Sequence, residues 1–186
     1  MIPTWDWELS LLHWFQSIHN PALDVIMKSF TFLGNIGLIW ILLALVLLFI
    51  PKYRQCGVSM AFSLILSLIF TNLVIKNIVA RPRPFTVDPT LLECFHVKQP
   101  TDWSFPSGHS AASFAASVAF FCNKGRKKVG AALMVLAALI SVSRLYLSVH
   151  FPTDVIAGII LGVIYGVAGA FIAKKTIFRP KREAVK

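Results

Sequence analysis

Charge is scarce in this chain. Only 14% of its 186 residues are charged, 8 of them acidic and 18 basic, while 56% are apolar. Typical soluble domains are about 25% charged, so the composition argues against a soluble globular protein. Several apolar runs reach the roughly 20 residues that a helix needs to cross the bilayer core. The composition therefore predicts an integral membrane protein.

Cysteine and carboxylate groups are also sparse. Cys56, Cys94 and Cys122 have neither the spacing of a disulfide framework nor that of a metal site. The few carboxylates form no credible cage for a divalent cation, so we expect no metal and no cofactor. The first 20 residues lack the basic start and small-residue cleavage site of a signal peptide. We expect the spans themselves to direct insertion.

The net charge of +10 would suggest a nucleic-acid partner in a soluble domain. Here most basic residues lie in two short loops and the tail, which the positive-inside rule assigns to the cytoplasm. They are Lys52, Arg54, Lys124, Arg126, Lys127, Lys128, Lys174, Lys175, Arg179, Lys181, Arg182 and Lys186. We expect no nucleic-acid partner, a basic cytoplasmic tail over residues 174–186, and a cell-membrane protein whose other polar clusters face away from the cytoplasm.

The apolar pattern predicts an all-α fold, a polytopic transmembrane helical bundle of about five to six spans that forms one domain over residues 1–186. The predicted spans cover approximately residues 22–50, 57–79, 107–122, 129–148 and 152–173. In the first of these, a break near Gly34 is favoured over one long tilted helix. Residues 81–104 contain four prolines and are expected to form a structured loop rather than a helix.

Residues 1–20 mix tryptophans with acidic residues and histidines. This mixture predicts an amphipathic helix that lies in the membrane interface, with the tryptophans at headgroup level. A frayed terminus is the alternative.

A first polar cluster lies at the end of the second predicted span. Lys76 is near the span end and Arg83 follows in the loop. Arginine offers a planar fork that matches phosphate oxygens, and lysine offers a point charge, so the pair predicts a phosphate clamp. The alternative is snorkelling of the charged groups to the interface. For Arg81, snorkelling or a role as a loop anchor is favoured.

A second cluster, Pro106-Ser107-Gly108-His109, opens an apolar helix rich in small residues. The free N–H groups and the dipole at a helix start attract an anion. Ser107 can add a hydroxyl, and Gly108 permits a close backbone approach. His109 would lie beside any anion bound there, although a helix-capping or interface histidine is the alternative.

A third cluster joins two predicted spans. Arg144 closes one span and His150 precedes the next, with Asp154 four residues beyond His150. A carboxylate bound to one ring nitrogen fixes the tautomer and makes the other nitrogen more nucleophilic. Compensation of the helix dipole is the alternative for Asp154. Taken together, span ends deliver complementary groups to one membrane face, which favours a common phosphate site.

The three clusters resemble the K-x6-RP, PSGH and SR-x5-H-x3-D motifs of the type-2 phosphatidic acid phosphatases, or lipid phosphate phosphatases. All three motifs are complete and in order, and the resemblance covers residues 57–173. It implies that His150 is a nucleophile forming a phosphohistidine, that Asp154 orients it, and that His109 is the general acid. It also implies a metal-independent phosphate cradle made of Lys76, Arg83, Ser107, Gly108 and Arg144.

The resemblance implies a membrane lipid that carries a phosphomonoester or a diphosphate. Undecaprenyl diphosphate is favoured because the site is expected to face outward; phosphatidylglycerophosphate and phosphatidic acid are alternatives. A phosphotransferase that passes the phosphoryl group to a second lipid is a near rival. Soluble vanadate-dependent haloperoxidases share the constellation, but five apolar spans argue against them. A lipid transporter or channel is the alternative of another class, although no paired broken helices in two halves are visible.

Overall fold

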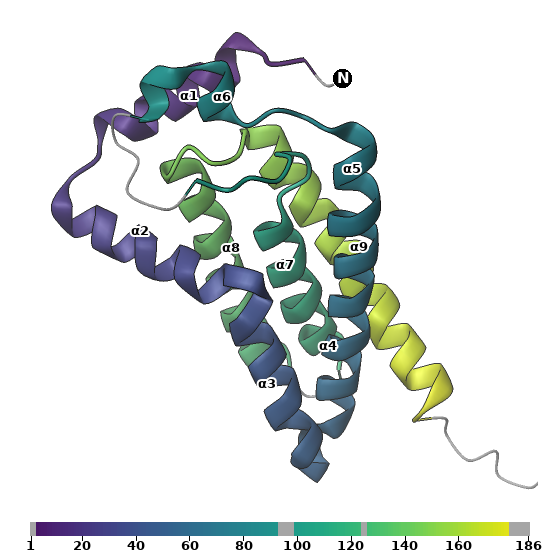
Figure 1. The fold of residues 1–186 in the computed structure, drawn as a ribbon. Coiled ribbons are helices and arrows are strands. Elements are labelled where there is room, and N and C mark those ends of the chain that lie inside the picture. The colour runs from purple at the N-terminus through teal and green to yellow at the C-terminus, as the bar shows by residue number, and fades with distance from the viewer. Residues whose placement is uncertain (1–2, 93–98, 124–125, 179–186) are drawn as a thin grey trace, which may run out of the picture.

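The computed structural model describes residues 3–92, 99–123 and 126–178. Within these ranges the protein is helical and has no β-strand, which confirms the predicted all-α bundle. The elements are α1 (Asp6–Ser17), α2 (Pro21–Gly34), η1 (Asn35–Gly37), α3 (Leu38–Phe49), η2 (Pro51–Tyr53), α4 (Arg54–Leu66), η3 (Ser67–Ile75), α5 (Lys76–Val79), α6 (Pro84–Val87), η4 (Pro89–Leu92), α7 (Gly108–Phe121), α8 (Lys127–Tyr146) and α9 (Pro152–Thr176). Figure 1 shows α7 in the middle of the bundle, where it packs against α4, α8 and α9.

Four helical stretches of the described chain are long and apolar enough to cross a membrane. They are Pro21–Phe49, Pro51–Val87, Lys127–Tyr146 and Pro152–Thr176, so the protein is a multi-pass membrane protein. The helix α7 has 14 residues and is about 21 Å long at 1.5 Å per residue. This is short for a bilayer core of roughly 30 Å. The count of five to six spans stays a prediction.

The predicted break near Gly34 is confirmed, because α2 ends at this residue. Ile36 and Gly37 follow with φ angles of 56° and 68°. Left-handed backbone is easily adopted by glycine and uncommon for a β-branched residue, so the chain changes direction here. As a result, α2 runs obliquely across the bundle while α3 continues along it (Figure 1).

The second predicted span is one continuous helical rod, formed by α4, η3 and α5. Its middle part, Ser67–Ile75, is π-helical, a rare conformation that is frequent at functional sites. The rod ends at Val79, because Ala80 adopts a left-handed conformation with φ of 48°. This ending leaves Lys76 one turn from the end of the rod and turns the chain into the loop that carries Arg83.

Small residues allow α7 and α9 to approach closely. A Cβ atom added at Gly162 of α9 would lie 2.6 Å from the carbonyl oxygen of Ala111, and one added at Gly158 would lie 2.6 Å from that of Ser107. Close backbone approach at small residues is a common basis of helix association in membranes. This packing fixes the start of α7 against the start of α9, where the second and third motifs lie.

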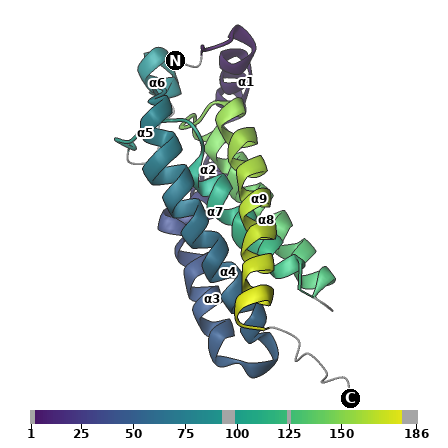
Figure 2. The ribbon, with the colours of Figure 1, turned by 90° about the vertical axis from the view of Figure 1, so that its right-hand side faces the viewer.

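The basic turns gather at one end of the molecule. The α3–α4 turn is tied to the start of α8 by a hydrogen bond of 3.1 Å that Arg126 Nη2 donates to the carbonyl oxygen of Lys52. Figure 2 places the end of α9 at this same end, and α1, α6 and the start of α9 at the opposite one. The three polar clusters therefore lie far from the basic turns.

The N-terminal segment forms the helix α1, which contacts α8 and η4. Trp5 and Trp7 at its start and Trp14 near its end are exposed. The described chain is helical from Asp6, so a frayed terminus does not account for this segment. The position of α1 in the membrane interface stays a prediction.

The expectation of a loop without helix over residues 81–104 was incomplete. Pro84 and Pro89 each begin a short helix, a position that suits the fixed φ of proline. Likewise, the predicted tail begins inside α9, since Lys174 and Lys175 form part of its last turn. Several residues discussed above lie outside the described chain: Cys94, Lys124, Arg179, Lys181, Arg182 and Lys186.

Candidate active site

One cavity of about 1170 Å³ brings the three clusters together. Each motif contributes two residues to its lining, although the motifs lie far apart in the chain. These six residues are Lys76, Arg83, Gly108, His109, Arg144 and His150. The two remaining predicted residues, Ser107 and Asp154, are completely buried. The geometry thus places cationic groups and two imidazoles around a common space.

His150 presents one ring nitrogen to the cations and the other to a carboxylate. Its Nε2 lies 3.5 Å from Arg83 Nη1, and its Nδ1 lies 3.7 Å from Asp154 Oδ2. Burial, followed by the charges of Arg83 and Arg144, holds the pKa of His150 well below its usual value. A neutral ring keeps a lone pair, which a nucleophile requires. The distance of 3.7 Å between His150 Nδ1 and Asp154 Oδ2 is longer than a hydrogen bond.

Asp154 is held from several sides at the start of α9. Its Oδ2 accepts the N–H of Phe151 at 2.9 Å and the hydroxyl of Ser104 at 2.5 Å. Its Oδ1 accepts a hydrogen bond of 2.6 Å from Arg81 Nη1. Arg81 is fully buried and does not snorkel, because its guanidinium is fixed in this network as the predicted loop anchor. Ser104 was missed in the sequence, since its partner lies 50 residues away.

His109 lies in the first turn of α7 and reaches back to the break between α2 and α3. Its Nε2 is 3.1 Å from Asn35 Oδ1. Its ring packs so closely on Gly34 that a Cβ added there would lie 2.7 Å from the His109 Cδ2 atom. The kink after α2 thus orients the second imidazole. Asn35 carried no sequence signal for this contact, because the pairing joins residues 74 positions apart.

Three cationic side chains are almost completely buried at the cavity. Arg83 Nη1 donates to the carbonyl oxygen of Val149 at 2.6 Å. Arg144 donates through Nη1 to the hydroxyl of Thr31, while its Nε has no partner among the described residues. Buried cations are costly unless they are paired or serve a function. The cavity therefore has the electrostatics of an anion site.

Comparisons with known proteins agree with this geometry. The model of the PAP2 superfamily matches residues 57–177, more than half of the chain. The chain belongs to the PAP2 superfamily. The resemblance inferred from the three motifs is thereby confirmed.

Individual PAP2 relatives are of similar size. An undecaprenyl-diphosphatase of Sulfolobus acidocaldarius is 33% identical, over 80% of this chain and 71% of the relative. A lipid A 4'-phosphatase of Bacteroides thetaiotaomicron is 28% identical, over 94% of this chain and 80% of the relative. The crystal structure of a PAP2-type phosphatidylglycerolphosphate phosphatase from Bacillus subtilis superposes with a TM-score of 0.73 at 26% identity, covering 92% of this chain and 87% of that one.

A carboxylate of the chain itself lies among the cations of this PAP2 site. Asp102 Oδ1 accepts a hydrogen bond of 2.6 Å from Arg83 Nη2, and Oδ2 forms an ion pair with Lys76. Partial burial alone would raise the pKa of Asp102, but the hydrogen bond and charge of Lys76 and the charge of Arg83 outweigh it and hold the pKa well below its usual range. Asp102 was not among the predicted site residues.

The PSGH residues have different environments. The Ser107 hydroxyl caps α7 by accepting the N–H of Ser110 at 3.4 Å and its hydroxyl at 3.1 Å, so a contact of Ser107 with phosphate stays a prediction. Gly108 borders the cavity, and a Cβ there would lie 2.6 Å from Asn72 Oδ1. A side chain at position 108 would therefore require the Asn72 amide to move.

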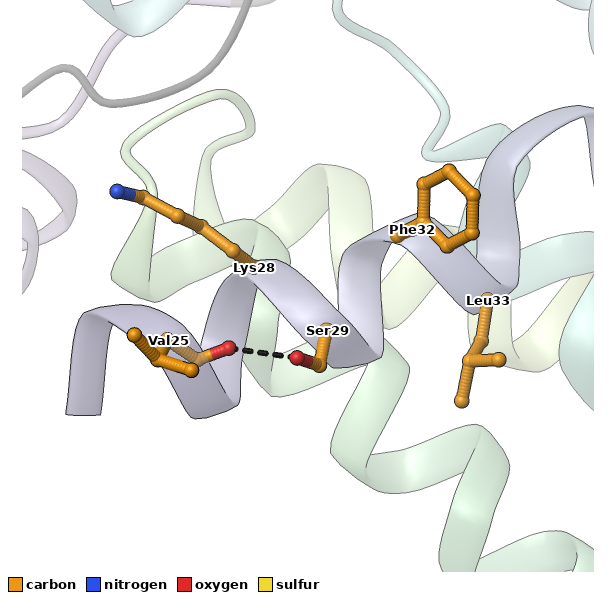
Figure 3. Close-up of a pocket in the computed structure, with 5 residues that line it drawn as sticks. All are labelled: Val25, Lys28, Ser29, Phe32 and Leu33. Atoms are coloured by element: carbon orange, nitrogen blue, oxygen red, sulfur yellow. Dashed lines mark hydrogen bonds between the residues drawn. The ribbon is translucent and has the colours of Figure 1, made fainter. Parts of the chain in front are cut away.

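A second hollow, of about 510 Å³, lies on α2 and is shown in Figure 3. It is lined by Val25, Lys28, Ser29, Phe32 and Leu33, all from one helix. The Ser29 hydroxyl donates to the carbonyl oxygen of Val25 at 2.7 Å, within the helix. Lys28 is the one titratable group of this lining, so the hollow offers no group of charged and polar side chains comparable to that of the PAP2 site.

No group of three or more His, Cys, Asp or Glu residues in the described chain is arranged to hold a metal ion.

Proposed function

We propose that this protein, a lipid phosphatase of the PAP2 superfamily, hydrolyses a membrane lipid phosphate or diphosphate through a phosphohistidine on His150. The observation that carries this proposal is the common cavity, which collects both histidines and three buried cations. The proposed roles are those implied by the motifs. His150 is the nucleophile, Asp154 orients it and His109 is the general acid.

The shape of the cavity supports a lipid as the substrate. From the polar site it continues between α3 and the rod of α4 and η3. Its walls there are aliphatic, formed by Ile41, Ala44, Leu45, Leu48, Ala61, Leu64, Ile65 and Leu68. A pocket that joins a few polar groups to an extended apolar wall suits an amphiphile, with its phosphate at the cations and its chain along the helices.

The proposed reaction proceeds in two displacements. The Nε2 lone pair of His150 forms a bond to phosphorus, while the bond from phosphorus to the leaving oxygen breaks and His109 gives that oxygen a proton. Water, from which His109 takes a proton, then attacks phosphorus and releases phosphate and free His150. Lys76, Arg83 and Arg144 stabilise the charge on the equatorial oxygens, which is the main demand of phosphoryl transfer.

Among possible lipids, we propose undecaprenyl diphosphate. A relative that is 33% identical is named an undecaprenyl-diphosphatase. The motif residues that line the polar part of the cavity lie by the starts of α7 and α9, opposite the end that carries the basic turns. The positive-inside rule assigns those turns to the cytoplasm. The site would then face outward across the cell membrane, where the carrier diphosphate is left after glycan polymerisation. Phosphatidylglycerophosphate and phosphatidic acid are the competing substrates.

A phosphate-release panel over purified lipids in detergent tests this proposal. We expect the largest kcat/KM with undecaprenyl diphosphate and a lower value with the phosphatidylglycerophosphate and phosphatidic acid arms. The variant His150→Ala should lose turnover while it still inserts and folds, and His13→Ala, which changes an exposed histidine of α1, should behave as wild type. Near-normal release by His150→Ala would contradict the nucleophile assignment, and phosphoryl transfer to an acceptor lipid would instead identify a phosphotransferase.

A further inference from the structure

A completely buried carboxylate in α1 is unexplained by the PAP2 motifs. Glu8 is 0% exposed, although Trp5, Asp6 and Trp7 beside it are exposed. Its Oε1 accepts the hydroxyl of Thr153 at 2.6 Å, and its Oε2 accepts a hydrogen bond of 2.7 Å from Arg81 Nη2. A buried carboxylate is costly unless it is paired. The partners of Glu8 therefore decide its purpose.

These partners connect Glu8 to the proposed catalytic residues. Arg81, also 0% exposed, donates to Glu8 through Nη2 and to Asp154 Oδ1 through Nη1, at 2.7 and 2.6 Å. Its guanidinium lies 4.0 Å from the centre of the Phe151 ring. Thr153, the other partner of Glu8, also accepts a hydrogen bond from Arg81. One guanidinium thus bridges two carboxylates directly behind the site.

The arrangement determines which oxygen of Asp154 faces His150. Because Arg81 binds Oδ1, the carboxylate cannot rotate freely, and Oδ2 stays 3.7 Å from His150 Nδ1. The charge of Arg81 is shared between Glu8 and Asp154, so the three groups together keep one negative charge. Without Glu8, the full positive charge of Arg81 would act on Asp154, and less negative potential would remain for the imidazole.

We propose that Glu8 and Arg81 are positioning residues of the hydrolytic site, which act on His150 through Asp154 and make α1 a structural part of that site. This inference rests on the proposed function. The inference has one distinctive consequence: Glu8 influences the chemical step although no residue of α1 lines the cavity. A purely structural anchor for α1 would instead affect folding and leave the chemistry of folded molecules unchanged.

The first test is the kinetics of Glu8→Gln in the full chain. The amide keeps the size of the side chain and loses its charge. We expect kcat to fall on the order of 10-fold, the size typical for outer partners of oriented histidines in metal sites. KM and the Ki of inorganic phosphate should stay within about twofold of wild type, because the cavity cations are untouched. The matched control is Asp6→Asn, which removes an exposed carboxylate of the same helix.

The second test is a double-mutant cycle with Asp154→Asn. If Glu8 acts through Asp154, Glu8→Gln should have little further effect on the residual kcat of Asp154→Asn. Additive losses, or a wild-type kcat in Glu8→Gln, would overturn the inference. If Arg81→Gln fails to fold, Arg81→Lys replaces it in the test. This variant keeps the positive charge but loses the planar fork of donors, so we expect it to retain part of the activity. A wild-type protein inactive on every lipid would instead remove the proposed function itself.

Discussion

At the scale of single residues, the cavity carries three buried cations and one partly exposed carboxylate. Buried cations require a counter-charge, and in this structure Asp102 supplies it to Lys76 and Arg83. A bound phosphate would offer the same two cations oxygen atoms of the same kind. In the proposed site, Asp102 and the substrate phosphate therefore compete for the same donors. The Nε of Arg144, by contrast, has no hydrogen-bond partner among the described residues.

This competition leads to a prediction for Asp102→Asn. Removing the charge should lower KM for a lipid phosphate by several-fold, because the substrate no longer displaces a carboxylate. The pKa of Asp102 lies well below its usual range, so the carboxylate is ionised throughout the neutral range. The difference in KM between the variant and wild type should therefore be the same at about pH 6 and about pH 8. Steady-state kinetics of both proteins provide the measurement. A raised KM would instead identify Asp102 as an anchor that holds the cations in place.

A second residue-scale prediction concerns the acid limb of activity. In the proposed mechanism, the reactive form of His150 is neutral. Its pKa lies well below the usual value because of burial and the charges of Arg83 and Arg144. Falling pH should therefore reduce kcat/KM only below about 6.5, the ordinary pKa of histidine. A pH profile of kcat/KM for wild type checks this. An acid limb centred above that value would contradict a neutral His150 held by burial.

At the scale of elements, much of the fold follows from local signals. The apolar runs predict the membrane helices, and the glycine-containing stretch after α2 predicts the break at Gly34. The π-helical segment of the second rod was not predicted, because nothing in its apolar run distinguishes it from an α-helix. The two helical turns inside the proline-rich loop were likewise missed.

The residues of the candidate site also differ in whether the sequence predicts them. The motif residues were predicted because they resemble a known pattern at fixed spacings. Asn35, Ser104 and Asp102 were missed because their roles come from contacts between distant segments. Glu8 was assigned only to an interfacial helix, since its burial depends on Arg81, which lies 73 residues away. Tertiary packing, and not local preference, creates these parts of the site.

Helix packing gives a prediction at this scale. In Gly162→Ala the new methyl group would lie 2.6 Å from the carbonyl oxygen of Ala111, so α9 and α7 must separate. Overpacking of this kind costs about 1 to 3 kcal/mol, and we expect a lower Tm in detergent together with reduced turnover, because α7 carries His109. The control is Ile160→Val, at an exposed position of α9. An unchanged Tm in Gly162→Ala would show that the two helices do not need this close contact.

At the scale of the whole molecule, the two ends of the bundle have opposite characters. One end holds the basic turns joined by Arg126 and Lys52. The other holds α1, the proline-rich loop and the starts of α7 and α9 (Figure 2). The polar part of the cavity is lined near this end by residues such as Arg83, His109 and His150. The aliphatic part of the cavity extends from this end between α3 and α4, so a lipid chain could remain among the helices while its phosphate reaches the site.

The cationic side chains of the cavity also lead to a prediction about metal dependence. Phosphoryl transfer needs positive charge at the equatorial oxygens, and here the fixed side chains of Lys76, Arg83 and Arg144 border the cavity. We therefore predict that phosphate release from a lipid diphosphate continues unchanged in excess EDTA. Removing one of these charges, as in Arg144→Gln, should cost on the order of 100-fold in kcat, and added magnesium should not restore it. The measurement is phosphate release by wild type and Arg144→Gln in EDTA and in magnesium. Loss of wild-type activity in EDTA with recovery in magnesium would mean that the three cations do not suffice.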